Sequence, residues 1–472
     1  MATSHGITRR GFLAGTAFGL AAGAPLAWLA GRHLPRFTGR AEEVLQPEYA
    51  MPGRFKGRVI RVHNPAAVKP RDSSLDAEIV RNMVHQGVVT LVGGDPKDRQ
   101  SAWKRFFEPG DVVGIKVNPV GRKPKPGEGG RVHNAVGCIS SPEVIVATVE
   151  GLKLAGVRAK DIIVFERYAD EFIETGYDKL LASRPMDGVR WLASAARYTD
   201  TQLDIEGFDE GRDAFSVELA RHVVGYDPDV FAHMGFSAPQ HDEKDDRRFR
   251  SHLSVIVSRM VNKFITIPCL KDHRSAGVTL ALKNLSHGLN NNVARSHVSG
   301  IAHGFMESRV TGPNQCNTFI PHAVAQHHTR QKATLHILDG LIGVYEGGPG
   351  CWNKTWGTWH YNSLLFATDP VAMDHVGWDI IDTKRTQMGW APVDRMGSVH
   401  HTPSVVTSSE FAALAGSNPL GAAALGCSAQ NMREGRASEA FDLRTPQHIS
   451  LAGGLGLGTF DADRIQYSVV RG

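Results

Sequence analysis

Polar side chains that could do chemistry follow several apolar segments of the chain. They are Lys116 and Asn118 at the end of segment 112–117, Lys271 and His273 after segment 264–267, Asp339 after segment 335–338, and Asp369 after segment 364–367. In an open parallel sheet, ligands bind beside the carboxyl ends of the strands. If these segments are parallel strands, their polar side chains meet at one edge of the sheet and form a single site.

The residue types predict a site for a small anionic substrate. Lys271, His273 and Lys283 are the candidate catalytic residues, because lysine and imidazole groups transfer protons and attract negative charge. The candidate substrate-binding residues are Lys116, Asn118 and Asn284. The alternative is that the lysines are solvated and the other polar groups serve turns and helix ends.

Histidines are frequent in the second half of the chain, which favours a transition metal as a cofactor. The candidate metal ligands are His287, His297, His303, Asp339, Asp369 and Asp374. None of their spacings reproduces a known ligand motif such as HExxH. Each histidine could instead be a hydrogen-bonded structural residue, and Asp369 before Pro370 is also a good helix cap. The identity of the cofactor therefore stays open.

Five cysteines are widely separated in the sequence and form no CxxC pair. They are Cys138, Cys269, Cys316, Cys351 and Cys427. This spacing argues against an iron–sulfur cluster or a cysteine-rich zinc site. The plain alternative for each one is a buried thiol with a packing role.

Other classes of function find little support in the composition. The chain has 472 residues and a formal net charge of +5, which is too weak over this length to indicate a nucleic acid partner. There is no GxSxG nucleophile elbow, which speaks against an α/β-hydrolase. The composition is that of an ordinary globular protein with 42% hydrophobic residues.

The order of predicted elements indicates an α/β fold with a mostly parallel sheet flanked by helices. The predicted strands are 59–62, 112–117, 162–165, 264–267, 335–338 and 364–367, and the predicted helices are 76–86, 141–155 and 369–381. Strands that are apolar throughout are typical of a parallel sheet buried on both faces. Residues 170–250 read as a polar insertion, and residues 384–430 as a loop-rich region near the C-terminus. We predict one domain over 58–472.

The N-terminal segment resembles an export signal. Residues 8–13 read TRRGFL, and a Gly/Ala-rich apolar run follows to about Ala30, which is the layout of a twin-arginine signal. We predict a signal or membrane anchor over 1–30, a linker over 31–57, export by the twin-arginine machinery, and a periplasmic location. Pro25 directly follows Ala22–Ala24, where a peptidase would cut, so an uncleaved anchor is the alternative.

Several segments together resemble a family of bacterial and archaeal proteins known as domain of unknown function 362. They are 114–118, 141–144, 155–157, 268–273, 277–285, 337–343, 346–349 and 368–374, and the resemblance extends over about 110–385. The chain departs from the family pattern at Cys269, where lysine is usual, and at Asp272, where threonine is usual. It also lacks the cysteine-rich ferredoxin-like segment of some members.

These observations lead to three functional hypotheses. The first is an exported enzyme that uses a metal or other cofactor on a small anionic substrate, with redox chemistry slightly favoured. The second is an isomerase or racemase that uses a Lys/His pair for proton transfer. The third is a periplasmic protein that binds a ligand or metal without catalysis.

Overall fold

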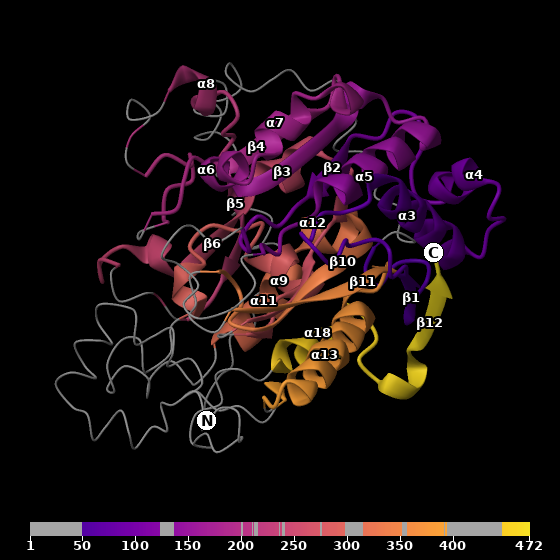
Figure 1. Ribbon diagram of the computed structural model, residues 1–472. Coiled ribbons are helices and arrows are strands. Elements are labelled where there is room, and N and C mark those ends of the chain that lie inside the picture. The colour runs from indigo at the N-terminus through magenta and orange to yellow at the C-terminus, as the bar shows by residue number, and fades with distance from the viewer. Residues whose placement is uncertain are drawn as a thin grey trace, which may run out of the picture. The chain divides into compact units, whose positions relative to one another are not determined.

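The structure is a computed structural model, and its described residues lie in one compact unit. The described residues are 50–122, 136–199, 202–209, 211, 216–235, 237, 241–273, 276–297, 315–351, 356–390, 392–393 and 446–472. Figure 1 shows a central sheet with helices packed on its faces. No helix in these ranges has the length and apolar character needed to cross a bilayer. The predicted segment 1–30, most of the linker and most of region 384–430 lie outside the described residues.

The sheet has ten strands, and most of their pairings are parallel. Its order is β12-β1-β11-β10-β7-β2-β3-β4, with β8 paired to β10 and β9 paired to β8. The strands are β1 (Arg58–His63), β2 (Val113–Lys116), β3 (Ile162–Tyr168), β4 (Arg190–Ala195), β7 (Lys263–Thr266), β8 (Cys269–His273), β9 (Gly277–Val278), β10 (Ala333–Glu346), β11 (Gly357–Ala367) and β12 (Gln466–Arg471). A separate hairpin contains β5 (Tyr226–His233) and β6 (Arg250–Ser254). The predicted α/β class is confirmed.

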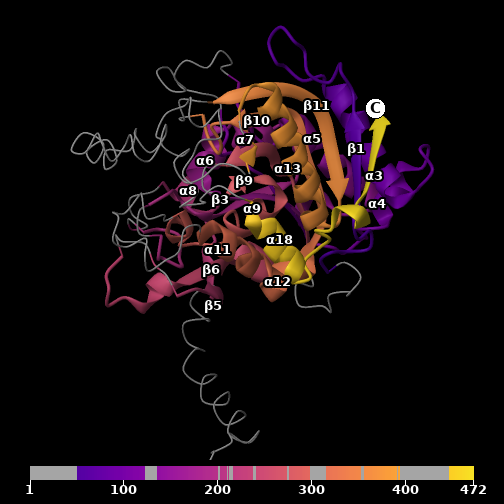
Figure 2. The same cartoon turned by 90° about the horizontal axis from the view of Figure 1, so that it is seen from below.

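The helices divide between the two faces of the sheet (Figure 2). The described helices are α3 (Ala77–Val92), α4 (Arg99–Lys104), α5 (Pro142–Ala155), α6 (Ala169–Glu174), α7 (Tyr177–Leu181), α8 (Val217–Ala220), α9 (Leu280–Ser286), α11 (Gln315–Val324), α12 (His327–Lys332), α13 (Pro370–Gln387) and α18 (Gln447–Gly454). Helices α3, α4 and α5 pack together beside β1 and β11, while α9 and α13 pack on β10 and on each other. The sheet is therefore a buried central layer.

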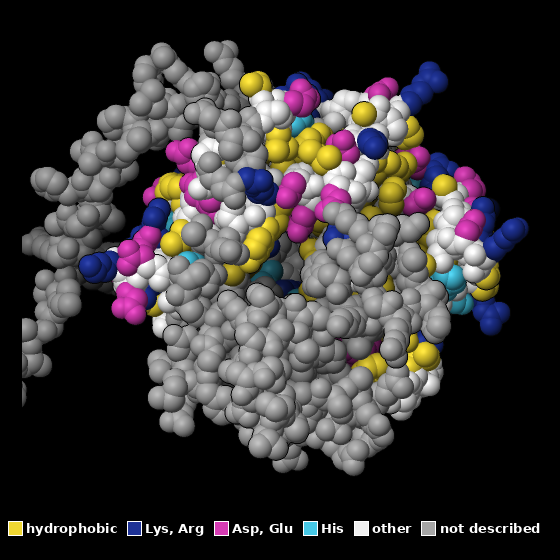
Figure 3. Space-filling view, turned by 60° about the vertical axis from the view of Figure 1, so that its left-hand side comes forward, with side chains coloured by type: hydrophobic (Ala, Val, Ile, Leu, Met, Phe, Trp, Pro, Cys, Tyr) yellow, Lys and Arg dark blue, Asp and Glu magenta, His cyan; other side chains and the backbone are white. Residues whose placement is uncertain are grey.

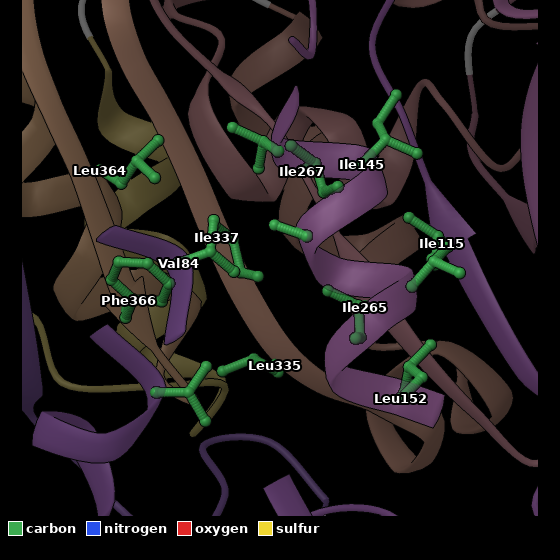
Figure 4. Packing of buried hydrophobic residues seen from close by; sticks show 14 of the residues in the cluster. Val84, Ile115, Ile145, Leu152, Ile265, Ile267, Leu335, Ile337, Leu364 and Phe366 are labelled. Carbon is green, nitrogen blue, oxygen red and sulfur yellow. The ribbon is translucent and has the colours of Figure 1, made fainter. Parts of the chain in front are cut away.

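The largest hydrophobic core lies between the sheet and helices α3 and α5. Figure 4 shows Ile145 and Leu152 of α5 facing Ile115 and Ile265 of the strands. Side chains alternate between the faces of a strand. Because Ile115 points into this core, its neighbour Lys116 points to the opposite face, where α9 lies.

Local sequence signals explain where the helices flanking the sheet begin and end. Helix α5 starts with Pro142 in its first turn and ends at Gly156, which has a φ of 100°. Helix α13 starts after Asp369, whose side chain accepts a hydrogen bond from the Ala372 amide, as expected of an N-cap. The starts of both helices and the end of α5 match the prediction, whereas α13 continues to Gln387, beyond its predicted end at 381.

Four strands of the main sheet were not predicted, namely β4, β8, β9 and β12. Strand β4 lies inside region 170–250, so that region is not only an insertion but also contributes the strand at one end of the sheet. Strand β12 forms the other end and pairs in parallel with β1. Its residues are mostly exposed, so it lacks the apolar run by which the buried strands were found.

Candidate functional site

Lys116 lies at the carboxyl end of β2, buried under helix α9. Its ammonium donates hydrogen bonds to Glu166 Oε2 at 2.5 Å, the Val117 carbonyl at 2.6 Å and Asn284 Oδ1 at 3.1 Å. Burial lowers the pKa of Lys116, and the Glu166 carboxylate opposes this shift. A side chain at Gly288 would place its Cβ 2.8 Å from Lys116 Nζ, so the glycine leaves room for the lysine.

Lys271 lies on β8, close to the end of β2. Its side chain is fully buried, and its ammonium donates to Asn118 Oδ1 at 3.1 Å. The backbone amide of Asn118 donates a hydrogen bond to the Ser140 hydroxyl at 2.7 Å, which fixes the position of Asn118. Within the described residues, Lys271 has no carboxylate within ion-pair distance. An ammonium has three donors, and burial without a counter-charge is costly.

Lys283 lies on helix α9, one position before the Asn284 that contacts Lys116. Burial lowers the pKa of Lys283 to about 7, and the positive charges of Arg167 and Lys271 act in the same direction. The nearby Cys316 thiol on α11 opposes the shift. A lysine that titrates near neutral pH can both accept and donate a proton under physiological conditions.

Strand β3 contributes charged residues that were not predicted. Glu166 accepts from Lys116 and also, through Oε1, from the Arg167 amide at 2.8 Å. The Arg167 guanidinium donates to the His287 carbonyl at 2.6 Å. Burial raises the pKa of Glu171, on helix α6, to about 7, with a contribution from the charge of Glu166. The site therefore contains carboxyl groups as well as cations.

We call Lys116, Arg167, Lys271 and Lys283 the cationic cluster. The four side chains come from β2, β3, β8 and α9. Lys116 donates hydrogen bonds to Glu166 and Asn284. The charges of Arg167 and Lys271 both act on Lys283. The Asn284 Nδ2 group is buried and has no hydrogen-bond partner in the described structure. The cluster thus combines buried positive charge with an unused donor, which is suited to an anion with several oxygen atoms.

His273 lies at the end of β8, two residues beyond Lys271. It is buried, and its Nδ1 accepts from the Ala276 amide at 3.2 Å. That contact spans the turn between β8 and β9. The structure brings together Lys116, Asn118, Lys271, Lys283 and Asn284.

The three predicted aspartates each bind backbone amides. Asp339 accepts from the amides of Ser141 at 2.8 Å and Leu341 at 3.1 Å, and Asp374 accepts from those of Ala281 at 2.7 Å and Leu282 at 2.8 Å. Burial raises the pKa of Asp339 to about 6. These carboxylates fix the starts of helices α5 and α9.

Asp369 lies at the opposite edge of the sheet, so its predicted place beside the other strand ends is wrong. Strand β11 is antiparallel to β10, and its carboxyl end meets the amino end of β1. There Asp369 accepts from the amides of Gly57 and Thr459, each at 2.9 Å, in addition to capping α13. The prediction had assumed that every strand runs in the same direction.

The histidines predicted as metal ligands are only partly described. His287 contacts the Ser296 hydroxyl through Nε2 at 2.6 Å and the Ser286 hydroxyl through Nδ1 at 3.1 Å. His297 ends the short helix η7 (Ala294–His297), and His303 lies outside the described residues. In the described parts of the chain, no three His, Cys, Asp or Glu residues are grouped so that they could hold a metal ion. The metal site stays a prediction.

The described part of one face of the molecule carries charges of both signs. In Figure 3, Lys and Arg side chains are interspersed with Asp and Glu side chains on the described part of the face shown. The lysines of the cationic cluster, in contrast, are buried, so a ligand that reaches them must be small.

Comparison with known proteins identifies the region that contains half of this cluster. No curated protein matches the chain. A family model matches residues 232–379, which include Lys271, Lys283 and Asn284 but neither Lys116 nor Arg167. The match is shorter than the resemblance over 110–385. Residues 232–379 are thus similar to the family described as domain of unknown function (DUF362).

Proposed function

We propose that the protein is an enzyme that acts on a small carboxylate or phosphate substrate bound by the cationic cluster. The observation that carries this proposal is the fully buried Lys271 ammonium, whose hydrogen bond goes to the neutral Asn118 amide. Buried charges in proteins are normally paired. An anionic substrate group would supply the missing partner of Lys271 and also accept from Asn284 Nδ2.

The chemistry that we propose is proton transfer to and from the bound substrate. Lys283 has a pKa of about 7, which suits a general base that must lose its proton again in each cycle. Cations around it would stabilise the negative charge that develops when a proton leaves a carbon next to a carboxylate. This supports the isomerase or racemase hypothesis, with Lys283 in place of the Lys271/His273 pair as the central base.

Solvent exchange provides a direct test of this reaction. The purified full-length protein would be incubated in D2O with a panel of 2-hydroxy acids, amino acids and phosphorylated sugars, and loss of C–H signals followed by proton NMR. We expect exchange with the wild type and with Lys332→Met, and none with Lys283→Met. Binding of a panel member without any exchange would contradict the enzymatic proposal and favour a binding protein.

A metal- or cofactor-dependent oxidoreductase is the other candidate, and it rests on the histidines and the export signal predicted from the sequence. Elemental analysis of protein purified from its native host tests it. A redox-active metal in stoichiometric amount, lost in a His303→Ala variant, would favour this candidate. Deuterium exchange by metal-free protein would favour proton transfer.

We also propose that the protein is exported by the twin-arginine route and works in the periplasm. The support is the segment 8–13 with Arg9 and Arg10, followed by an apolar run. Fractionation of cells that express the full chain tests this. We expect the wild type in the periplasmic or membrane fraction, and the Arg9→Lys, Arg10→Lys double variant in the cytoplasm. An unchanged distribution would contradict the proposal.

A further inference from the structure

A pocket lies between helix α13 and the strands β11, β1 and β12, on the face of the sheet opposite to α3 and α5. Its volume is about 490 Å³, within the range of sites that bind small molecules. Figure 2 shows α13 beside β11, with β1 and β12 next to them. No residue of the cationic cluster lines this pocket, so it is separate from the site proposed above.

Aromatic side chains of the strands form one wall, and we therefore call this cavity the aromatic pocket. Trp359 and Tyr361 lie two positions apart on β11, and their ring centres are 5.9 Å apart. Tyr467 comes from β12. Three rings from two strands offer faces and edges on which a flat ligand can stack.

One face of α13 forms the facing wall. The lining positions on this helix recur every three or four residues, as expected for a single helical face. Val376 and Ile380 supply apolar surface, while Asp379 and Lys384 supply charge. Asp379 is the single carboxylate among the described lining residues, whereas Arg61 and Lys384 are both positive, so the lining has an excess of positive charge.

Arg61 is held with its guanidinium against the aromatic wall. Its Cζ atom lies 4.6 Å from the centre of the Tyr361 ring. Its Nε donates a hydrogen bond to the Ser363 hydroxyl at 3.2 Å, and its Nη1 donates to the Tyr467 hydroxyl at 3.4 Å. All three partners are neutral. Among the described residues, no acceptor binds Nη2 and no carboxylate pairs with the guanidinium.

Lys384 brings the second positive charge to the aromatic pocket. It lies in the last turn of α13 and is half-buried. No hydrogen bond or ion pair joins its ammonium to another residue in the described part of the chain. A fixed guanidinium and a nearby ammonium that both lack a counter-charge favour a carboxylate, which can accept two hydrogen bonds from an arginine side chain.

We propose that the aromatic pocket binds an aryl monocarboxylate of one or two rings, distinct from the substrate of the cationic cluster. The ring system packs against Trp359 and Tyr361, and the carboxylate accepts hydrogen bonds from Arg61 and Lys384. Asp379 repels a second negative charge, so the pocket should select monocarboxylates. The volume of about 490 Å³ leaves room for two fused rings.

Isothermal titration of the full-length protein with three ligands of the same shape tests the proposal. The ligands are 2-naphthoate, the neutral 2-naphthamide and the cationic 2-naphthylmethylamine. We expect 2-naphthoate to bind at least about tenfold more tightly than the other two, because only it gains charged hydrogen bonds with Arg61. Tighter binding of the amide or the amine, or no binding of 2-naphthoate, would overturn the proposal. This comparison requires no variant.

Substitutions then locate the binding site. Arg61→Gln should lower the affinity for 2-naphthoate at least about tenfold. Arg58→Gln is the matched control, because Arg58 lies on the same strand, 5.5 Å from the centre of the Phe55 ring, and does not line the pocket. It should bind 2-naphthoate as the wild type does.

A third variant separates this proposal from the proposed enzymatic function. Lys271→Met should bind 2-naphthoate as the wild type does, and Arg61→Gln should bind inorganic phosphate as the wild type does. Weaker binding of 2-naphthoate in Lys271→Met, with unchanged binding in Arg61→Gln, would place this ligand in the cationic cluster and overturn the inference.

Discussion

Lys271 and Lys332 are both buried lysines, but they differ in how their charge is accommodated. The Lys332 ammonium donates to the carbonyls of Val257 at 2.7 Å and Ser258 at 3.0 Å. These contacts join helix α12 to the turn before β7 and have an evident structural role. Lys271 has the single acceptor Asn118 Oδ1 in the described structure. The contrast supports a ligand-binding role for Lys271 and makes Lys332 its natural control.

Lys283 should make the stability of the protein depend on pH. Its pKa falls from 10.5 to about 7 on folding. Between these values the unfolded chain holds a proton on Lys283 that the folded chain lacks, so stability rises with pH, by up to about 1.4 kcal/mol per unit. We expect Lys283→Met to make this rise smaller in urea unfolding measured from pH 7 to 10, while Lys332, whose pKa burial lowers to about 8, keeps part of it.

The exposed Lys153 provides the control for this experiment. Lys153→Met should leave the dependence of stability on pH as in the wild type. An equal slope in the wild type and in Lys283→Met would mean that Lys283 keeps its proton in the folded state. In that case Lys283 could not serve as the base.

The sequence predicted the lysines and asparagines of the site but missed half of its charges. Lys116 and Lys271 were found because they end or follow an apolar segment. Glu166 and Arg167 directly follow segment 162–165, so the same rule applied to β3 would have found them. Glu171 carried no such signal, because its role depends on how α6 folds back beside β3.

At the scale of elements, the helix that follows β11 depends on a single buried carboxylate. Asp369 accepts hydrogen bonds from the amides of Gly57, Ala372 and Thr459, and so joins three segments. We expect Asp369→Ala to lower the free energy of unfolding by about 2–4 kcal/mol, because buried amides lose their acceptor. Chemical denaturation measures the loss.

Asp76 is a matched control, since it caps helix α3 through one amide, that of Ile79. Asp76→Ala should cost about 1 kcal/mol. Neither variant should change anion binding, because both carboxylates lie outside the cationic cluster. Loss of anion binding in a folded Asp369→Ala protein would mean that this residue belongs to the site after all.

The packing of α3 on β11 requires a glycine at the contact. A Cβ on Gly87 would lie 2.0 Å from Cε2 of Phe366, inside the core. We expect Gly87→Ala to destabilise the protein by about 1–3 kcal/mol through overpacking, despite the better helix propensity of alanine. Gly454 lies at the end of α18 with no atom near its Cβ position, so Gly454→Ala should be neutral or slightly stabilising in the same measurement.

The direction of a strand could not be predicted from its composition. Strand β11 is apolar where it was predicted, as parallel strands are, but it pairs antiparallel with β10. Its direction moved Asp369 away from the predicted site.

For the whole molecule, the fold explains how one site can use residues more than 160 positions apart. The parallel strands β2, β3 and β8 run toward the same edge of the sheet. Helix α9 lies at that edge, on the face opposite to α3 and α5. The hydrophobic core on the face covered by α3 and α5 holds the strands in place. The lysines lie on the opposite face and do not contribute to that core. The α/β class was predictable from the apolar strands, whereas the edge strands β4 and β12 were not.

Binding of simple anions to the full-length protein tests the central claim most directly. Isothermal titration with inorganic phosphate and with small carboxylates would compare the wild type, Lys271→Met and Lys332→Met. We predict that Lys271→Met lowers the affinity at least about tenfold, as expected for loss of a hydrogen bond to a charged group, while Lys332→Met binds as the wild type does. Equal affinity in Lys271→Met, or no binding of any of these anions by the wild type, would contradict the account.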